Sequence, residues 1–264
     1  MMLERAPAAP RQQADGQGAA LSIGGGSVTI FEQLPAERLQ AMLAAGDEIN
    51  ECYRVLRKTD ANVVGEVLKG QGTFYEWDHY PEGDVFDHET HSQYYYHAHR
   101  GETGEHGHFH TFLRAEGFPP GVQPVPYDGA EQWPTGEDAL CHIIAIAMDK
   151  QGYPTHLFTT NRWVTGESFH AADDVIVMQD RFEIDHAYPS WPANRWISAM
   201  LRLFQPQIGL LLRQRDDAIE RWRRAHPDRD VFEDRDLDIT SSMPISVTRQ
   251  IKEVRRRLAR AHAS

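Results

Sequence analysis

The sequence is poor in long hydrophobic runs, in cysteine and in positive charge. No stretch approaches the roughly 18 to 20 apolar residues that a membrane-spanning helix requires, so we expect no transmembrane segment. Residues 1–26 carry alanine, proline, glutamine and glycine where a secretory signal would carry a continuous apolar stretch. We therefore expect a cytoplasmic protein.

Cys52 and Cys141 are the two cysteines. Their separation excludes a disulfide framework and a CxxC metal site, and so small a number suits a reducing compartment. The formal net charge of −12 argues against broad nucleic-acid binding, which requires a basic surface that neutralises phosphates. The basic run near the C-terminus is typical of a solvated helix face, and its role stays open. It comprises Arg249, Lys252, Arg255, Arg256, Arg257 and Arg260.

The remaining composition is that of a globular protein, and 264 residues are enough for a substantial core. Residues 1–28 contain too few large apolar side chains to offset the entropy of ordering, so we expect a disordered tail. Residues 29–264 are expected to form a single domain.

Hydrophobic periodicity predicts the elements of this domain. Helical spacing indicates helices over 35–58 and 61–68, and again after Pro192, where Pro206 should split a long segment before a last helix near the C-terminus. Over residues 72–165 the period changes from 3.6 to 2, and β-branched and aromatic residues become frequent. The pattern predicts an α+β fold, in which flanking helices accompany an antiparallel sheet of about five strands. The expected strands cover 73–80, 92–100, 106–114, 141–148 and 155–163.

Histidines concentrate in the middle of the predicted sheet. Eight of the 14 lie between residues 79 and 110. The runs Tyr-His-Ala-His-Arg (96–100) and Glu-His-Gly-His-Phe-His-Thr-Phe (105–112) place histidines two apart, which puts them on one face of a strand. Because Gly-Glu-Thr-Gly (101–104) is a natural four-residue turn, Arg100 should pair with Glu105. This register sets His99 opposite His106, His97 opposite His108, and Tyr95 opposite His110.

Five imidazoles on one face predict a transition-metal site, since neutral imidazole is the commonest metal-binding side chain. All-nitrogen ligation suits Zn, Fe, Cu or Ni and does not choose among them. Glu102 and Glu105 at the turn could complete the ligand shell or act as a general base, and Arg100 could hold an anionic substrate. His142 and His156 are further candidates, as ligands or as outer partners of ligands. The predicted ligands are His97, His99, His106, His108 and His110.

The two histidine runs, together with Leu-Phe-Thr-Thr-Asn-Arg-Trp-Val-Thr (157–165), resemble an uncharacterised bacterial domain family of unknown function over residues 35–225. This resemblance implies no activity. The run from His106 to Phe112 also resembles the histidine-triad motif of nucleotide hydrolases and transferases, although Gly107 stands where that motif has an apolar residue. His97 and His99, followed by a glutamate, resemble the first metal motif of cupins, with off-pattern spacing and no good second motif.

The leading hypothesis is a metal-dependent enzyme, an oxygenase or a hydrolase, that acts on a small-molecule substrate. A histidine-triad-like nucleotide hydrolase or transferase and a non-catalytic metal-handling protein are the alternatives. We expect no nucleic-acid or membrane partner, and homo-oligomerisation is left open.

Overall fold

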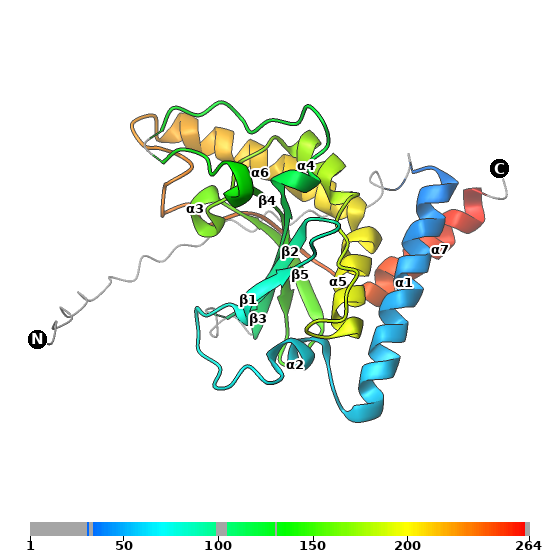
Figure 1. The fold of residues 1–264 in the computed structure, drawn as a ribbon. Helices are drawn as coiled ribbons and strands as arrows, with labels where there is room; N and C mark the ends of the chain where they lie inside the picture. The colour runs from blue at the N-terminus through cyan, green and yellow to red at the C-terminus, as the bar shows by residue number, and fades with distance from the viewer. Residues whose placement is uncertain (1–30, 32–33, 99–104, 130, 262–264) are drawn as a thin grey trace, which may run out of the picture.

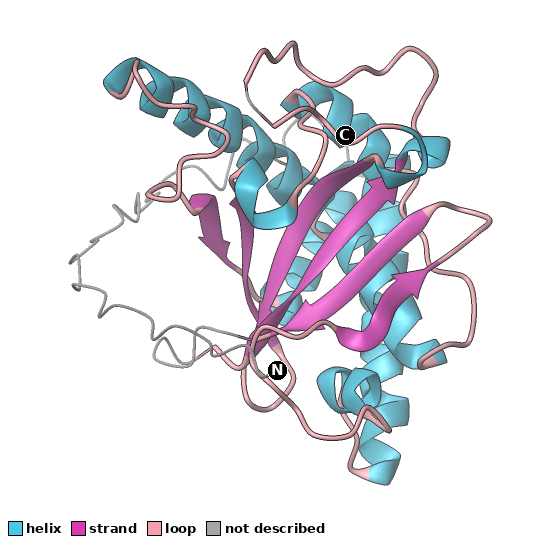
Figure 2. Ribbon diagram, turned by 60° about the vertical axis from the view of Figure 1, so that its left-hand side comes forward, coloured by secondary structure: helices cyan, strands magenta, loops and turns pink. Residues whose placement is uncertain are grey.

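The computed structural model describes residues 31, 34–98, 105–129 and 131–261. Six antiparallel strands form one open sheet, and helices pack against it (Figures 1 and 2). The strands are β1 (Tyr80–Phe86), β2 (Ser92–His97), β3 (Gly107–Arg114), β4 (Leu140–Met148), β5 (Pro154–Thr160) and β6 (Ile239–Pro244), and their order in the sheet is their order in the chain. The predicted α+β class is confirmed, with six strands instead of about five.

The helices occupy both ends of the described chain and the segment after β5. They are α1 (Ala36–Leu56), α2 (Val63–Leu68), α3 (Arg162–Thr165), α4 (Ala172–Gln179), α5 (Trp191–Leu203), α6 (Gln205–Ala225) and α7 (Val247–Ala261). The predicted break near Pro206 is present: α5 ends at Leu203 and α6 starts at Gln205. Proline has no backbone N–H, and the first turn of a new helix is where that donor is not needed. Among the described residues, no helix has the length and apolarity to cross a membrane.

The strands differ from the sequence-based prediction at the first strand and at the sheet edge, and the strand predicted over 155–163 ends at Thr160, before α3 begins at Arg162. Residues 73–79 form a loop, and the first strand starts at Tyr80; within this loop Trp77 has a positive φ angle, which interrupts an extended chain. The sixth strand was missed because its sequence, Ile-Thr-Ser-Ser-Met-Pro, lacks regular alternation. Such a short polar strand with a terminal proline is typical of a sheet edge, which is where β6 lies.

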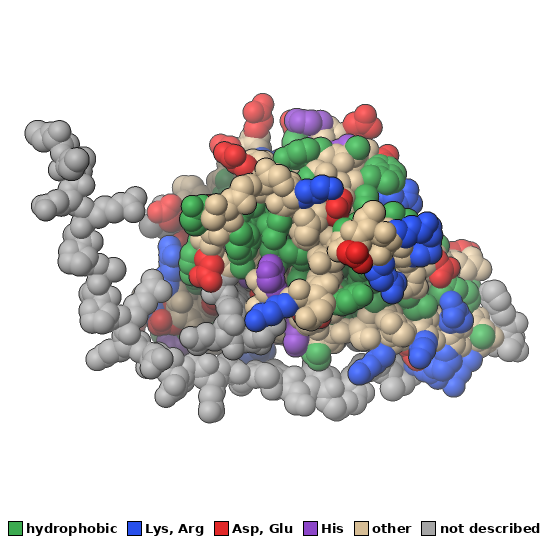
Figure 3. Space-filling view, turned by 90° about the horizontal axis from the view of Figure 1, so that it is seen from below, with side chains coloured by type: hydrophobic (Ala, Val, Ile, Leu, Met, Phe, Trp, Pro, Cys, Tyr) green, Lys and Arg blue, Asp and Glu red, His purple; other side chains and the backbone are tan. Residues whose placement is uncertain are grey.

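One face of the sheet packs on helices. Tyr94, Tyr96 and Phe109 are buried on this face, and Phe109 lies 5.7 Å from the ring of Trp196 on α5. Behind α5, helices α1 and α7 pack together, and Lys and Arg side chains gather at this end of the molecule (Figures 1 and 3). The opposite face of the sheet carries the histidines, and we call it the histidine face.

Candidate metal centre

The pairing of β2 with β3 follows the predicted register. His97 is opposite His108, Tyr95 is opposite His110, and Tyr96 is opposite Phe109. His108 and His110 are two residues apart on β3, so both point to the same side as His97. The predicted pair of His99 with His106 cannot be followed, because His99 lies outside the described residues.

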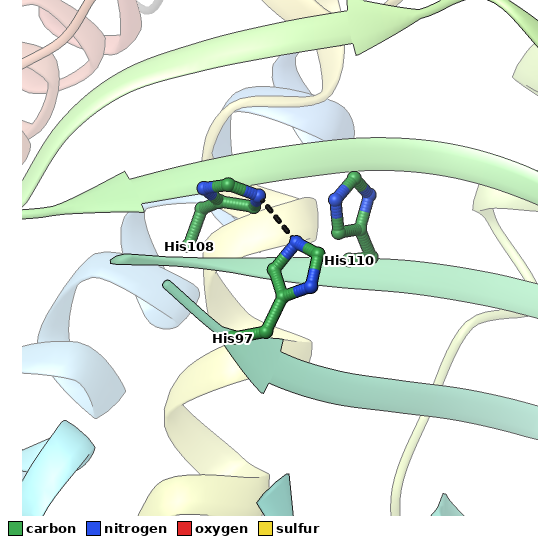
Figure 4. Close-up of side chains that lie close together, drawn as sticks. All are labelled: His97, His108 and His110. Atoms are coloured by element: carbon green, nitrogen blue, oxygen red, sulfur yellow. Dashed lines mark hydrogen bonds between the residues drawn. The ribbon is translucent and has the colours of Figure 1, made fainter. Parts of the chain in front are cut away.

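His97, His108 and His110 converge into one buried group, shown in Figure 4. One ring nitrogen from each residue lies within 4.8 Å of the other two. The Nε2 atoms of His97 and His108 are 2.7 Å apart, within hydrogen-bond distance. The residues are 8%, 1% and 0% exposed, respectively, so these polar rings are removed from water. Because buried polar groups are costly without partners, these rings are expected to have polar partners inside the protein.

Glu105 orients one of these rings. The Nδ1 atom of His108 donates a hydrogen bond to Oε1 of Glu105, which leaves Nε2 to face His97. A carboxylate on the far nitrogen of a metal-binding histidine fixes its tautomer and raises its basicity as a ligand. Glu105 was predicted to complete the ligand shell or to act as a general base; the structure places it behind His108.

His142 contacts a second ring of the group. Its Nε2 atom lies 3.0 Å from Nδ1 of His110. Burial, assisted by the charge of Arg215, lowers the pKa of His142 to about 3, so its imidazole is neutral at physiological pH. Two of the three imidazoles therefore have their Nδ1 atoms occupied by other side chains.

Aromatic side chains surround the group. Tyr95 lies 5.2 Å from His110, and Phe158 lies 5.2 Å from His108, measured between ring centroids. His79 stacks on Tyr95 at 3.6 Å and meets the edge of His97 at 5.7 Å, while its Nδ1 atom lies 3.1 Å from Asp84. His79 is not among the ligands predicted from the sequence. No local pattern signals its place, because the 73–79 loop brings it over β2.

Other predicted site residues lie elsewhere. His106 stands outside the group: its Nδ1 atom is 2.6 Å from the hydroxyl of Tyr96, whose ring packs on Phe109 on the helix-covered face. The alternation does not extend to His106 because β3 begins at Gly107. His156 lies on β5 opposite Ala147, which separates it from His108. Arg100 and Glu102, like His99, fall outside the described residues.

The donor set fits a transition-metal ion. Three neutral imidazoles suit Zn, Cu, Fe or Ni, and a zinc–nitrogen bond of about 2.0 to 2.1 Å places tetrahedral ligand nitrogens roughly 3.3 Å apart. The present distances range from 2.7 Å to within 4.8 Å, so ring movements of roughly an ångström would produce that geometry. The fit therefore requires no change of the strands that carry the ligands.

The protein also has a cavity away from the histidine group. A cavity of about 590 Å³ is lined by the 125–129 segment, by α6 and by residues 227–232, and its lining includes Tyr127, Phe169 and Phe232. None of the three grouped histidines contributes to it. This cavity and the histidine group are separate features.

The fold and the site together define an α+β protein with three converging, buried histidines on the face of an antiparallel sheet opposite α5. Residues 43–245 match a domain of unknown function, DUF6969, and the chain belongs to this family. The resemblance to an uncharacterised domain family is thereby confirmed. No curated protein and no solved structure matches the chain.

The two other resemblances can be compared with this geometry. A histidine-triad motif uses alternating histidines of one strand, whereas the group here takes only His108 and His110 from β3 and His97 from β2. A cupin is a barrel, whereas the described strands form an open sheet with β1 and β6 at its edges.

Proposed function

We propose that the protein binds a transition-metal ion through His97, His108 and His110. The observation that carries this proposal is the convergence of three buried ring nitrogens within 4.8 Å of one another. The outer contact of His108 with Glu105 supports it, because metal-bound histidines nearly always donate their second N–H to a carboxylate, a backbone carbonyl or water. Nδ1 of His110 also has a polar partner, Nε2 of His142.

We further propose that the protein is a metal-dependent enzyme, an oxygenase or a hydrolase with a small-molecule substrate. Three protein ligands leave a coordination position at which an ion supplies Lewis acidity or activates a small ligand. Glu105 would hold His108, while Tyr95 and Phe158 would keep bulk water from the rings. Catalysis in the cytoplasm is consistent with two buried free cysteines.

A non-catalytic metal-handling protein is the second candidate. The near-complete burial of the three rings, and the place of the 590 Å³ cavity away from them, favour storage or transfer of an ion over turnover of a substrate. Both candidate functions use the same three histidine ligands. They differ in whether small molecules can reach the bound ion.

Metal analysis tests the shared part of these proposals. Protein purified without a histidine tag should contain close to one equivalent of Zn, Fe, Cu or Ni, and the His97→Ala/His108→Ala variant should lose it. A matched control, His88→Ala/His226→Ala, removes two histidines outside the group and should keep the ion. Wild-type protein that takes up none of these ions at neutral pH would disprove the proposal.

Cobalt substitution separates the two candidates. If one coordination position is open, azide or cyanide should change the visible spectrum of the cobalt-loaded protein. An unchanged spectrum at saturating anion would reject the enzyme and favour metal handling.

A further inference from the structure

An irregularity in the β3–β4 pairing brings His142 to the histidine face. Thr111 pairs with Ile144, but the next residue, Phe112, pairs with His142, so Ile143 is an additional residue on β4. Without this bulge Phe112 would pair with Ile143, and His142 would belong to the helix-covered face with Leu113. Bulges of this kind re-aim side chains and are frequent beside functional sites.

A buried carboxyl group holds the bulge. The backbone N–H of His142 donates to Oε2 of Glu167 at 2.7 Å, and the hydroxyl of Thr165 donates to Oε1 of the same side chain. Glu167 is completely buried, and burial raises its pKa to about 7 despite the nearby charge of Arg215. Burying a carboxyl group costs free energy unless it is hydrogen-bonded, and here the hydrogen bond from the backbone N–H of His142 both satisfies Glu167 and fixes the bulge.

We propose that His142 is a positioning residue: its Nε2 accepts a hydrogen bond from Nδ1–H of His110 and thereby directs Nε2 of His110 towards the metal ion. This inference rests on the proposed function, because it assumes that His110 is a metal ligand. A neutral imidazole has one donor and one acceptor nitrogen, and a ligand nitrogen must be unprotonated. His110 can therefore bind an ion through Nε2 only while Nδ1 carries the proton, and His142 Nε2, at 3.0 Å, is placed to accept a hydrogen bond from Nδ1–H.

The outer partners of the two β3 ligands differ in their chemical group. Glu105 behind His108 carries a carboxyl group, whereas His142 behind His110 carries an imidazole. A carboxylate raises ligand basicity more than a neutral acceptor does, so His110 is the weaker donor of the pair. The contribution of His142 is thus mainly orientation.

Imidazole ¹⁵N NMR of the metal-free protein tests the proposal directly, because it reports which ring nitrogen carries the proton. Wild-type His110 should be in the Nδ1–H form. In His142→Gln, whose side-chain oxygen can still accept, His110 should keep this form. In His142→Leu, which removes the acceptor and retains bulk, His110 should show a mixture of the two tautomers.

Zinc titration provides the second measurement. His142→Leu should bind Zn²⁺ roughly 10 to 100 times more weakly than wild type, while His142→Gln should lie within a few-fold. His156→Leu, the same change at a histidine beyond Ala147, is the control and should leave affinity unchanged.

The outcomes separate this inference from the proposed function. A wild-type His110 in the Nε2–H form, or unchanged tautomer and affinity in His142→Leu, would overturn the role of His142. If His142→Leu does not fold, the His142→Gln variant is used instead. Finding His110 in the Nε2–H form in that variant would also overturn the role of His142. Failure of the wild type to bind any ion would reject the metal site. The NMR result on metal-free protein would still decide whether His142 fixes the tautomer of His110.

Discussion

The Nε2 atoms of His97 and His108 lie 2.7 Å apart and face each other across paired strands. Because Nδ1 of His108 donates to Glu105, the neutral His108 ring can only accept at Nε2, so His97 donates from its Nε2–H. In the metal-free protein the proton of His97 therefore occupies the nitrogen that a metal ion requires.

This relationship predicts a change of tautomer on metal binding. His97 should convert from the Nε2–H form to the Nδ1–H form when Zn²⁺ is added, while His108 should remain in the Nδ1–H form throughout. ¹⁵N NMR of the two rings during a zinc titration measures both. A His97 ring that is Nδ1–H from the start would contradict the assigned hydrogen-bond direction.

Replacing Glu105 should weaken metal binding without abolishing it. Glu105→Gln retains an oxygen that can accept from His108 but removes the negative charge, so we expect zinc affinity to fall roughly 10- to 100-fold. Competition with a chromophoric chelator measures the affinity. Glu137→Gln, at an exposed position outside the site, serves as control. Equal affinities for the two variants would show that Glu105 does not act on the site.

Gly107 should tolerate no side chain. A Cβ atom there would lie 2.4 Å from the Tyr96 hydroxyl and 2.6 Å from the carbonyl oxygen of His97. Since one of these neighbours is backbone, Gly107→Ala should cost roughly 1 to 3 kcal/mol in the free energy of unfolding. Gly65→Ala on α2, where the nearest atom is 3.6 Å away, should instead stabilise by about 0.5 to 1 kcal/mol. Urea denaturation compares the two, and equal stabilities would refute the close contact.

Glu167 should give the stability a specific pH dependence. Its pKa is raised from 4.5 to about 7 in the folded protein, so its contribution is fully present below about pH 4.5 and is lost as pH rises through 7. Relative to Glu167→Gln, which does not titrate, wild type should lose up to about 3 kcal/mol between pH 4.5 and 8. Urea unfolding of both proteins at several pH values measures this difference. Parallel profiles would mean that Glu167 is ionised in the folded state.

The histidine pair across β2 and β3 was predictable because it depends only on local rules. Strand side chains alternate with a period of two, and an even turn between two runs decides which residues face each other. His97 opposite His108 follows from these rules alone, without knowledge of the rest of the fold.

The remaining features depend on interactions that a local pattern does not contain. A strict alternation places His142 on the wrong face, because nothing in the apolar run of β4 marks Ile143 as a bulge. His106 does not lie on the histidine face. It precedes the first residue of β3, and its Nδ1 atom is within hydrogen-bond distance of the Tyr96 hydroxyl. His79 reaches Tyr95 through the 73–79 loop, in which Trp77 has a positive φ angle that the sequence does not signal.

The close packing of α1 on α7 bears on where the folding unit ends. The match to DUF6969 stops at residue 245, immediately before α7, and starts at residue 43, inside α1. Yet a Cβ on Gly46 would lie 2.6 Å from Ile251, and Val254 is completely buried in the same core as Met42. A fragment cut at the limits of the family match would lose α7 and expose the apolar surface of α1 that α7 covers. The limits of the family match and the limits of the buried core therefore differ in this chain.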